Sequence, residues 1–218
     1  MLHGEAYLDS KQKRQLDVLS ASAVALSLGI PAAVAGIAIR SIDRQPAIFR
    51  NIRLGQNWQS FEVFKLTTMQ SDAHFYEKQW QNDKTDARVT NLGRIIRLLD
   101  LNEVPQTANI IRGDMHFIAA RPVNEHVLTR LQDAEPSLFD EWHALYPMFK
   151  PGLVGPGQLA ERSLVRCGDL LGASRSRMTE DINYWTNDAS VETDLRVAMN
   201  VPMEYLAHIL HSDEVNAP

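Results

Sequence analysis

The feature that most constrains the fold is a run without a charged side chain, which extends from Val18 to Ile39. As a helix, a run of this length reaches across the hydrocarbon core of a membrane. Pro31 lies inside it, where its ring removes a helical hydrogen bond and kinks the chain. Lysines and arginines flank both ends, and the positive-inside rule then places both ends on the cytoplasmic side. These features are compatible with a re-entrant membrane helix over residues 18–39, which enters and leaves from one face.

Two other structures are compatible with the same run. Its basic start, its apolar centre and the segment Ala33-Val34-Ala35 imitate a secretory signal and its cleavage site. A helix rich in alanine and buried in a soluble protein has a similar composition. Taken by themselves, these residues leave all three interpretations open.

Short strands and helices are expected in the rest of the chain. Two runs with alternating apolar residues, 46–55 and 61–69, meet at the turn-like residues Gly55-Gln56-Asn57 and predict a β-hairpin. A brief strand is expected over residues 115–119, and apolar residues at helical spacing continue over residues 124–149. We expect an α+β fold, in which the re-entrant helix is followed by a mainly helical cytoplasmic domain with a small β-hairpin.

The chain is long enough for one domain with a substantial core. We divide it into a polar and basic N-terminal segment (1–17), the re-entrant helix (18–39), the cytoplasmic domain (40–210) and a polar tail (211–218). Within the domain, residues 70–85 are expected to form a polar helix and loop. Trp80 in that segment suits either the lipid interface or an ordinary surface position.

Composition excludes some classes of function. The formal net charge of −5 argues against a general nucleic-acid binder, so no nucleic-acid partner is expected. Basic residues outnumber acidic ones in residues 1–60, and a basic end beside an apolar run suits an anionic membrane surface. Cys167 is the only cysteine, which excludes an intramolecular disulfide.

The segment from Asp100 to Pro122 concentrates charged residues between apolar ones. Its charges are Asp100, Glu103, Arg112, Asp114 and Arg121. Around a turn, such charges can face one cleft, where carboxylates hold a divalent cation and arginines hold phosphate. The alternative is a solvated turn with surface ion pairs, which contribute little.

The order of residues in this segment resembles the signature of the bacterial sugar transferases, the monotopic polyprenol-phosphate phosphoglycosyl transferases. The residues that carry the resemblance are Glu103, Pro105, Gln106, Asn109, Arg112, Gly113, Asp114, Met115, Arg121 and Pro122. Outside the segment, further matches are Lys13, Arg14, Asp17, Pro31, Arg53, Gly55, Lys65, Thr68, Met69, Asp86, Arg88, Thr90, Gly93, Arg97, Lys150, Gln158, Asp181, Tyr184, Ser190 and Asp194.

The resemblance implies transfer of a phosphosugar from a UDP-sugar to polyprenol phosphate during synthesis of surface polysaccharides. It places the protein on the cytoplasmic face of the bacterial inner membrane, with Mg²⁺ as cofactor and a glycosyltransferase as an optional partner. It assigns catalysis to position 102 and Glu103, and the metal to Glu103 and Asp114. The residues that it assigns to phosphate or substrate binding are Lys65, Arg88, Arg112, Arg121 and Gln158.

Four departures from the family pattern put the chemistry in question. Asn102 occupies the position of the nucleophilic aspartate, and a neutral amide oxygen is a poor nucleophile. Thr67 replaces a basic residue, and Ala119-Ala120 replaces Gly-Pro in the loop before Arg121. Asp100 is near, but in a helix a two-residue offset turns its side chain to a different face, whereas in a loop it could reach.

Three hypotheses follow from these departures. The protein is a transferase with impaired chemistry, a non-catalytic relative that binds nucleotide or lipid phosphate and modulates a partner enzyme, or a structural protein of the membrane surface. Whether it is an enzyme stays open at this point.

Overall fold

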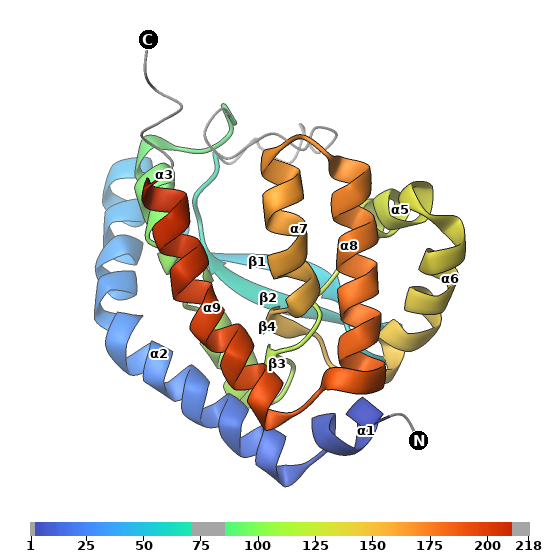
Figure 1. The fold of residues 1–218 in the computed structure, drawn as a ribbon. Helices are drawn as coiled ribbons and strands as arrows, with labels where there is room; N and C mark the ends of the chain where they lie inside the picture. The colour runs from blue at the N-terminus through green and yellow to red at the C-terminus, as the bar shows by residue number, and fades with distance from the viewer. Residues whose placement is uncertain (1–2, 71–85, 211–218) are drawn as a thin grey trace. The chain divides into compact units, whose positions relative to one another are not determined.

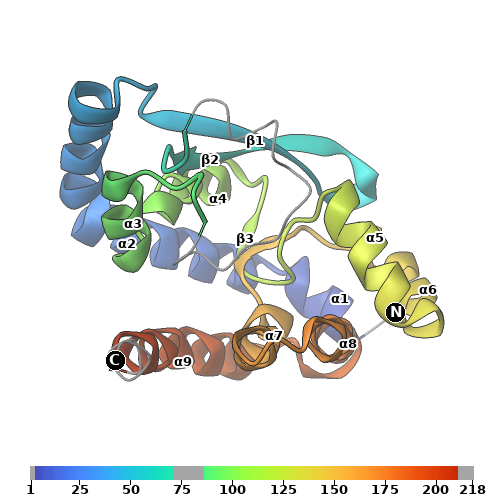
Figure 2. The ribbon, with the colours of Figure 1, turned by 90° about the horizontal axis from the view of Figure 1, so that it is seen from above.

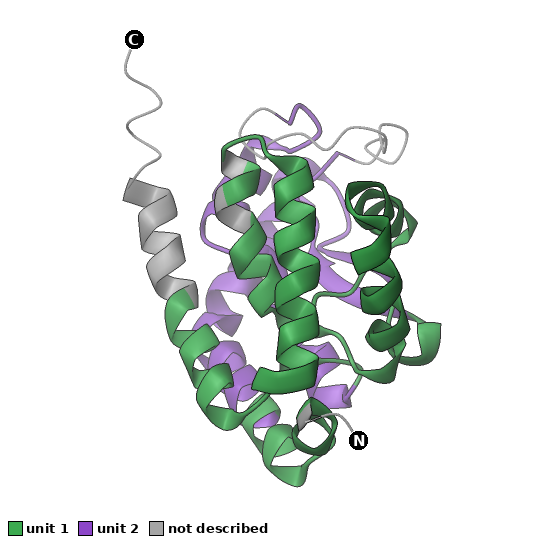
Figure 3. Ribbon diagram, turned by 45° about the vertical axis from the view of Figure 1, so that its right-hand side comes forward, with its two compact units in different colours: residues 1–17, 53–60, 114–218 green, residues 18–52, 61–113 purple. Residues whose placement is uncertain are grey.

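The computed structural model describes residues 3–70 and 86–210. The chain forms two compact units that are interleaved along the sequence (Figure 3). Unit 1 consists of residues 1–17, 53–60 and 114–218, and unit 2 consists of residues 18–52 and 61–113. The sequence predicted one domain over residues 40–210, whereas here each unit also takes residues from the segment before residue 40. The expected helix and loop around Trp80 and the tail 211–218 lie outside the described residues.

The predicted long apolar helix is confirmed as α2 (Lys11–Ala38), which continues as the π-helical turn η1 (Ile39–Asp43). Figure 1 shows that α2 bends partway along its length. Pro31 accounts for a bend, because it cannot donate the usual hydrogen bond to the carbonyl of Ser27. The Ser27 hydroxyl also donates back to the carbonyl of Ala23 at 2.8 Å, a contact that bends helices.

The predicted β-hairpin is also confirmed. Strands β1 (Ile48–Leu54) and β2 (Ser60–Leu66) form a two-stranded sheet, joined through the short 3₁₀ turn η2 (Gln56–Trp58). Figure 2 shows the two strands running side by side. Alternating apolar residues suit such a sheet because successive side chains point to opposite faces.

The rest of unit 2 is helical. Helix α3 (Asn91–Leu98) begins at Thr90, whose hydroxyl accepts from the amide of Gly93. The 3₁₀ turn η4 (Leu101–Glu103) and helix α4 (Gln106–Arg112) follow. The core of unit 2 packs apolar residues of α2, β2, α3 and η4 together, namely Ala32, Ala35, Ile39, Leu66, Ile96, Leu101 and Val104.

Unit 1 is mainly helical. Helix α1 (His3–Leu8), in the segment expected to be polar, buries Leu8. The later helices are α5 (Glu125–Ala134), α6 (Pro136–Leu145), α7 (Pro156–Arg166), α8 (Leu170–Asn183) and α9 (Val191–Leu210), with the turns η5 (Tyr146–Met148) and η6 (Tyr184–Asp188). Helices α7 and α8 lie side by side, and Figure 2 shows both end-on. The core of unit 1 is aromatic. The rings of Trp142, Tyr146 and Trp185 contact one another, and the Phe149 ring stacks on Trp185.

A second, parallel sheet in unit 1 pairs β3 (His116–Ile118) with β4 (Gly152–Val154). The sequence predicts the brief strand β3, whereas β4 is not predicted from it. The register places His116 opposite Gly152. A Cβ atom at Gly152 would collide with the amide nitrogen of Ala119, so this close pairing requires glycine.

Candidate active site

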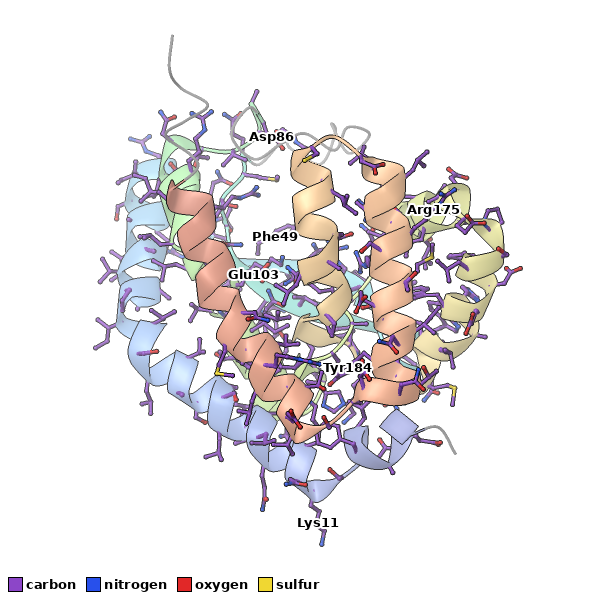
Figure 4. All side chains as sticks on the ribbon, in the orientation of Figure 1. Lys11, Phe49, Asp86, Glu103, Arg175 and Tyr184 are labelled. Carbon is purple, nitrogen blue, oxygen red and sulfur yellow. The ribbon has the colours of Figure 1, made fainter. Side chains whose placement is uncertain are left out.

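The central ion pair of the candidate site joins Lys65 on β2 to Glu103 on η4. The Lys65 Nζ atom lies 3.0 Å from Glu103 Oε1, and about a quarter of each side chain is exposed, 24% and 23%. Figure 4 labels Glu103 within unit 2. The sequence assigned Lys65 to phosphate and Glu103 to metal and catalysis. The structure brings these two residues into direct contact.

Asn109 fixes the strand that carries Lys65. Its side-chain oxygen accepts from the amide of Phe64 at 3.1 Å, and its side-chain nitrogen donates to the carbonyl of Glu62 at 2.7 Å. Asn109 is fully buried in α4, so these two bonds tie α4 to β2. At the end of α4, the Arg112 guanidinium lies over the Phe64 ring at 4.9 Å from its centre. Arg112 itself is exposed.

Position 102 faces inward. The Oδ1 atom of Asn102 is buried and, among the described residues, has no hydrogen-bond partner. Gln106 follows on α4 with 0% exposure, and neither polar atom of its side chain has a partner in the described part of the chain. Buried polar groups of this kind are costly, and such costs concentrate at functional sites. Gln106 was not among the predicted site residues, although its place in the family motif could have indicated it.

Asp100 precedes this turn in an unusual backbone conformation. Its φ angle is 53°, in the left-handed region that residues other than glycine adopt infrequently. Its side chain does not cap η4. Its carbonyl accepts a hydrogen bond from the amide of Glu103 at 3.2 Å. Asp100 and Glu103 are therefore the first and last residues of one hydrogen-bonded turn.

Arg88 is held by Asp86 at the start of the α3 region of unit 2. Its guanidinium lies 2.6 Å from Asp86 Oδ2 and donates through Nε at 2.8 Å to Oδ1. This bond to Arg88 lowers the pKa of the buried Asp86 carboxyl, against the opposing effect of burial. Arg97 donates to the Thr68 hydroxyl at 2.9 Å. Both arginines thus have fixed positions in unit 2.

Arg121 is positioned by the loop that contains β4. Its guanidinium donates to the carbonyl of Leu153 at 2.6 Å, and its own carbonyl accepts from Arg177 at 3.4 Å. Ala119 and Ala120, which replace Gly-Pro, are buried against β4. Gln158 on α7 has a buried side-chain oxygen without a partner among the described residues.

Arg177 belongs to a buried charge cluster between α5, α7 and α8. It contacts Glu161 at 3.6 Å and Asp181 at 3.8 Å, and Glu161 also pairs with Arg130 at 3.3 Å. Complete burial raises the pKa of Asp181 to about 6, while the Arg177 charge and the bond from Trp142 oppose that rise. The cluster thereby fixes Arg177, which donates a hydrogen bond to the backbone carbonyl of Arg121.

A second buried network lies at the base of α2 and was not predicted as a unit. The Lys13 ammonium contacts Asp17 at 3.0 Å, Asp194 at 2.7 Å and the carbonyl of Ile118 at 2.8 Å. Tyr184, labelled in Figure 4, donates to Asp194 at 2.6 Å. Lys13, Asp17, Tyr184 and Asp194 match the family pattern, but the resemblance assigned them no role. Their buried contacts connect α2 to β3 and α9 within unit 1.

The predicted site residues divide between the two units. Unit 2 contains Lys65, Arg88, Asn102, Glu103 and Arg112, and unit 1 contains Asp114, Arg121 and Gln158. Asp114 is exposed directly after α4. In the part of the chain that the structure describes, no group of three or more His, Cys, Asp or Glu side chains could hold a metal ion. The assignment of Glu103 and Asp114 to Mg²⁺ stays a prediction.

The apolar helix presents its side chains to the outside. Within the described residues, Lys11–Asp43 is one stretch that is long and apolar enough to cross a membrane; an 18-residue window of it has a mean hydropathy of 2.0, and 22% of that window is buried. Leu26 is 83% exposed and Ile30 76% exposed. A core helix of a soluble protein would be mostly buried, so this exposure favours association with a membrane.

Comparison with known proteins identifies a matching family and several relatives. The profile of the bacterial sugar transferase family matches residues 8–208. A UDP-glucose:undecaprenyl-phosphate glucose-1-phosphate transferase from Caulobacter vibrioides is 32% identical over 86% of this chain and 67% of that protein. The exopolysaccharide production protein ExoY from Rhizobium meliloti is 34% identical over 69% of this chain and 70% of its own length.

Some relatives are much longer than this chain. An undecaprenyl-phosphate glucose phosphotransferase from Komagataeibacter xylinus is 35% identical over 52% of this chain, which spans only 21% of that protein. The match to that protein therefore covers about half of this chain and about a fifth of the relative.

Proposed function

We propose that this chain, which belongs to the bacterial sugar transferase family, transfers a phosphosugar from a UDP-sugar to polyprenol phosphate in the synthesis of an exopolysaccharide. The observation that carries the proposal is the ion pair between Lys65 on β2 and Glu103 of the family's central motif. Two relatives are named for a transfer between a glucose donor and undecaprenyl phosphate. Both substrates of such a transfer are phosphate anions, which a site must neutralise before they can react.

The basic residues of the chain suit that task. Lys65 places a positive charge beside Glu103. The guanidinium of the exposed Arg112 packs over the Phe64 ring. Arginine presents donors in a planar fork that matches phosphate oxygens. Arg88, Arg121 and Gln158 are also proposed to bind phosphate or substrate. Preorganised charges of this kind stabilise the additional negative charge of phosphoryl transfer.

Mg²⁺ is the proposed cofactor, held by Glu103 and Asp114. Mg²⁺ is usually bound through one or two carboxylates together with substrate phosphates, and two partly exposed carboxylates on one motif fit that pattern. When bound, the ion would neutralise phosphate charge. Lys65 keeps the Glu103 carboxylate in a fixed position for that role.

The proposed location is the cytoplasmic face of the inner membrane, with residues 18–39 entering and leaving from that face. The exposed apolar side chains of α2, its bend and the basic residues on both flanks support this arrangement. It would place the soluble part of the chain beside a lipid-linked acceptor without a second membrane crossing.

We further propose that the chemistry is impaired relative to the family, because position 102 carries an amide. That same amide favours a second candidate, a non-catalytic relative that binds nucleotide or lipid phosphate and modulates a partner glycosyltransferase. A purely structural role at the membrane surface is the third.

One assay separates the three candidates. Purified protein is incubated with polyprenol phosphate, Mg²⁺ and a panel of UDP-sugars, and release of UMP is measured. We expect slow release with at least one sugar. Binding of UDP-sugar without UMP release would instead support the non-catalytic relative, and neither binding nor release would support the structural role.

A further inference from the structure

We propose that Asp181 on α8 is a positioning residue for Arg121, and that its negative charge holds the Arg121 loop (residues 119–122) in the conformation that binds the diphosphate of a UDP-sugar. The inference rests on the transferase function proposed above, in which Arg121 binds phosphate or substrate. Asp181 is completely buried and acts without touching the substrate. Every contact in the argument lies within unit 1.

The first connection between Asp181 and the Arg121 loop runs through Arg177. The Arg177 Nε atom lies 3.8 Å from Asp181 Oδ2, and the same guanidinium donates to the carbonyl of Arg121 at 3.4 Å. A second carboxylate, Glu161 on α7, lies 3.6 Å from Arg177 and also pairs with Arg130 at 3.3 Å. Without the Asp181 charge, Arg177 is drawn toward Glu161, and its long hydrogen bond to Arg121 is the contact most easily lost.

The second connection runs through the turn between β4 and α7. Gly157 lies so close to Asp181 that a Cβ atom at Gly157 would collide with the carboxylate atom Oδ1. A Cβ atom at Gly155 would lie 2.6 Å from the first carbonyl oxygen of the Arg121 loop. The turn therefore touches Asp181 at one residue and the loop at another. Leu153, just before this turn, accepts the hydrogen bond from the Arg121 guanidinium at 2.6 Å.

The charge at position 181 lowers the stability of the folded protein. Complete burial raises the pKa of the Asp181 carboxyl to about 6, so its ionisation at neutral pH is less favourable than in water. An asparagine could accept the same hydrogen bond from the Trp142 indole without this penalty. Shifted pKa values concentrate at functional sites, and function commonly accounts for residues that reduce stability. Positioning of Arg121 gives the carboxylate such a function.

The neighbours of Asp181 determine what its ionisation changes. Among the described residues, the charged or titratable groups that act on it are Arg177 on the same helix and Glu161 on α7. The Tyr146 hydroxyl of η5 is close enough to respond to Asp181, but burial raises the pKa of that hydroxyl, which keeps it neutral. Protonation of Asp181 therefore removes the charge of one of the two carboxylates that Arg177 contacts in the described structure.

The test measures the affinity of the full-length protein in detergent for UDP-glucose and UDP-N-acetylgalactosamine, by isothermal calorimetry with Mg²⁺ at pH 7. We expect Asp181→Asn to weaken binding about 3- to 10-fold, as for one displaced hydrogen bond. The double variant with Arg121→Ala should bind no more weakly than Arg121→Ala alone, because Asp181 acts through Arg121. Asp140→Asn, at an exposed carboxylate of α6, is the matched control and should leave the affinity unchanged.

Two further measurements separate positioning from a purely structural role. The affinity of the parent protein should fall as the pH is lowered through the Asp181 pKa of about 6, and Asp181→Asn should abolish this fall. The diphosphate of a UDP-sugar keeps its charge over this range, so the ligand does not produce the effect. Asp181→Asn should also be more stable than the parent at pH 7, so its weaker binding cannot come from a damaged fold.

Other outcomes overturn the assignment. Parent-like affinity of Asp181→Asn, a further loss in the double variant, or a joint loss of affinity and stability would overturn the role of Asp181 and leave the transferase function standing. Unchanged affinity in Arg121→Ala would overturn it too, because the residue through which Asp181 acts would not bind the ligand. If neither UDP-sugar binds to the parent protein, the inference and the proposed function both fail.

Discussion

Lys13 and Asp194 are far apart in the sequence, yet the lysine Nζ atom lies 2.7 Å from Asp194 Oδ2 in the interior of unit 1. Lys13 also neutralises Asp17, so one cation serves two buried carboxylates. Tyr7 and Tyr184 donate to Asp194, and burial with this acidic neighbour raises the pKa of the Tyr184 hydroxyl well above its usual value. The hydroxyls therefore act as neutral hydrogen-bond donors across the whole physiological range.

Lys13→Met should destabilise the protein strongly. The substitution preserves most of the length of the side chain but leaves Asp17 and Asp194 without their counter-charge, and breaking a buried ion pair in this way costs about 3–5 kcal/mol. Urea unfolding in detergent would measure the loss. Lys11→Met, at an exposed lysine close by on the same helix, should change stability by less than about 0.5 kcal/mol. Equal effects of the two substitutions would contradict the buried network.

Asp181 should make stability depend on pH. Because its pKa is raised to about 6 in the folded protein, protonation favours the folded state. The contribution is fully present below the ordinary pKa of an aspartate and is lost as the pH rises through about 6. Asp181→Asn should therefore stabilise the protein at pH 7, by on the order of 3 kcal/mol, and should make little difference below pH 4.

The measurement for Asp181 is a series of unfolding curves between pH 4 and pH 8. The Trp142 indole can still donate to the amide oxygen that the substitution introduces, so that hydrogen bond is retained. A difference between the two proteins that does not vary with pH would show that Asp181 has an ordinary pKa.

Arg121→Ala should weaken the binding of UDP-sugar about 10- to 100-fold, because removal of a charged hydrogen-bond donor from a phosphate costs about 1.5–3 kcal/mol. Isothermal calorimetry with and without Mg²⁺ would measure the change. Arg175→Ala is the control. Arg175, labelled in Figure 4 on α8, is exposed and pairs with Glu135 at 3.2 Å. Unchanged affinity in Arg121→Ala would remove this residue from the proposed site.

The re-entrant arrangement predicts that both flanks of α2 lie on the cytoplasmic side. Single cysteines at positions 5 and 45, in a chain whose Cys167 has been replaced by serine, should react with a membrane-impermeant maleimide only after the cells are opened. Labelling of one position in intact cells would establish a complete crossing instead. A mature N-terminus near Gly36 would identify a cleaved signal.

The sequence predicted those elements whose pattern is local. The charge-free run gave α2, and the alternation of apolar residues gave β1 and β2, because each pattern repeats within one element. Strand β4 was not predicted, because three residues with a leading glycine show no periodic pattern and their partner β3 lies far away in the sequence. Nothing local distinguishes such a strand.

Local sequence patterns also did not predict the contacts within the candidate site. The family motif located Glu103, Asp114 and Arg121, but the contact between Lys65 and Glu103 depends on how β2 packs on η4. The left-handed φ of Asp100 was not visible either, since aspartate occurs in helices and turns alike. The burial of the Gln106 side chain without a hydrogen-bond partner among the described residues likewise depends on the tertiary structure, so the sequence does not predict it.

The interleaving of the units bears on how the chain matures as it leaves the ribosome. Lys13 and Asp17 emerge early, whereas Asp194 is among the last residues of the described structure to be synthesised. Until then the start of α2 lacks its final partner, and unit 1 cannot close because its contacts span nearly the whole chain. A nascent chain arrested before α9 would therefore leave the Lys13 ammonium without Asp194, and its buried network would stay incomplete until α9 is synthesised.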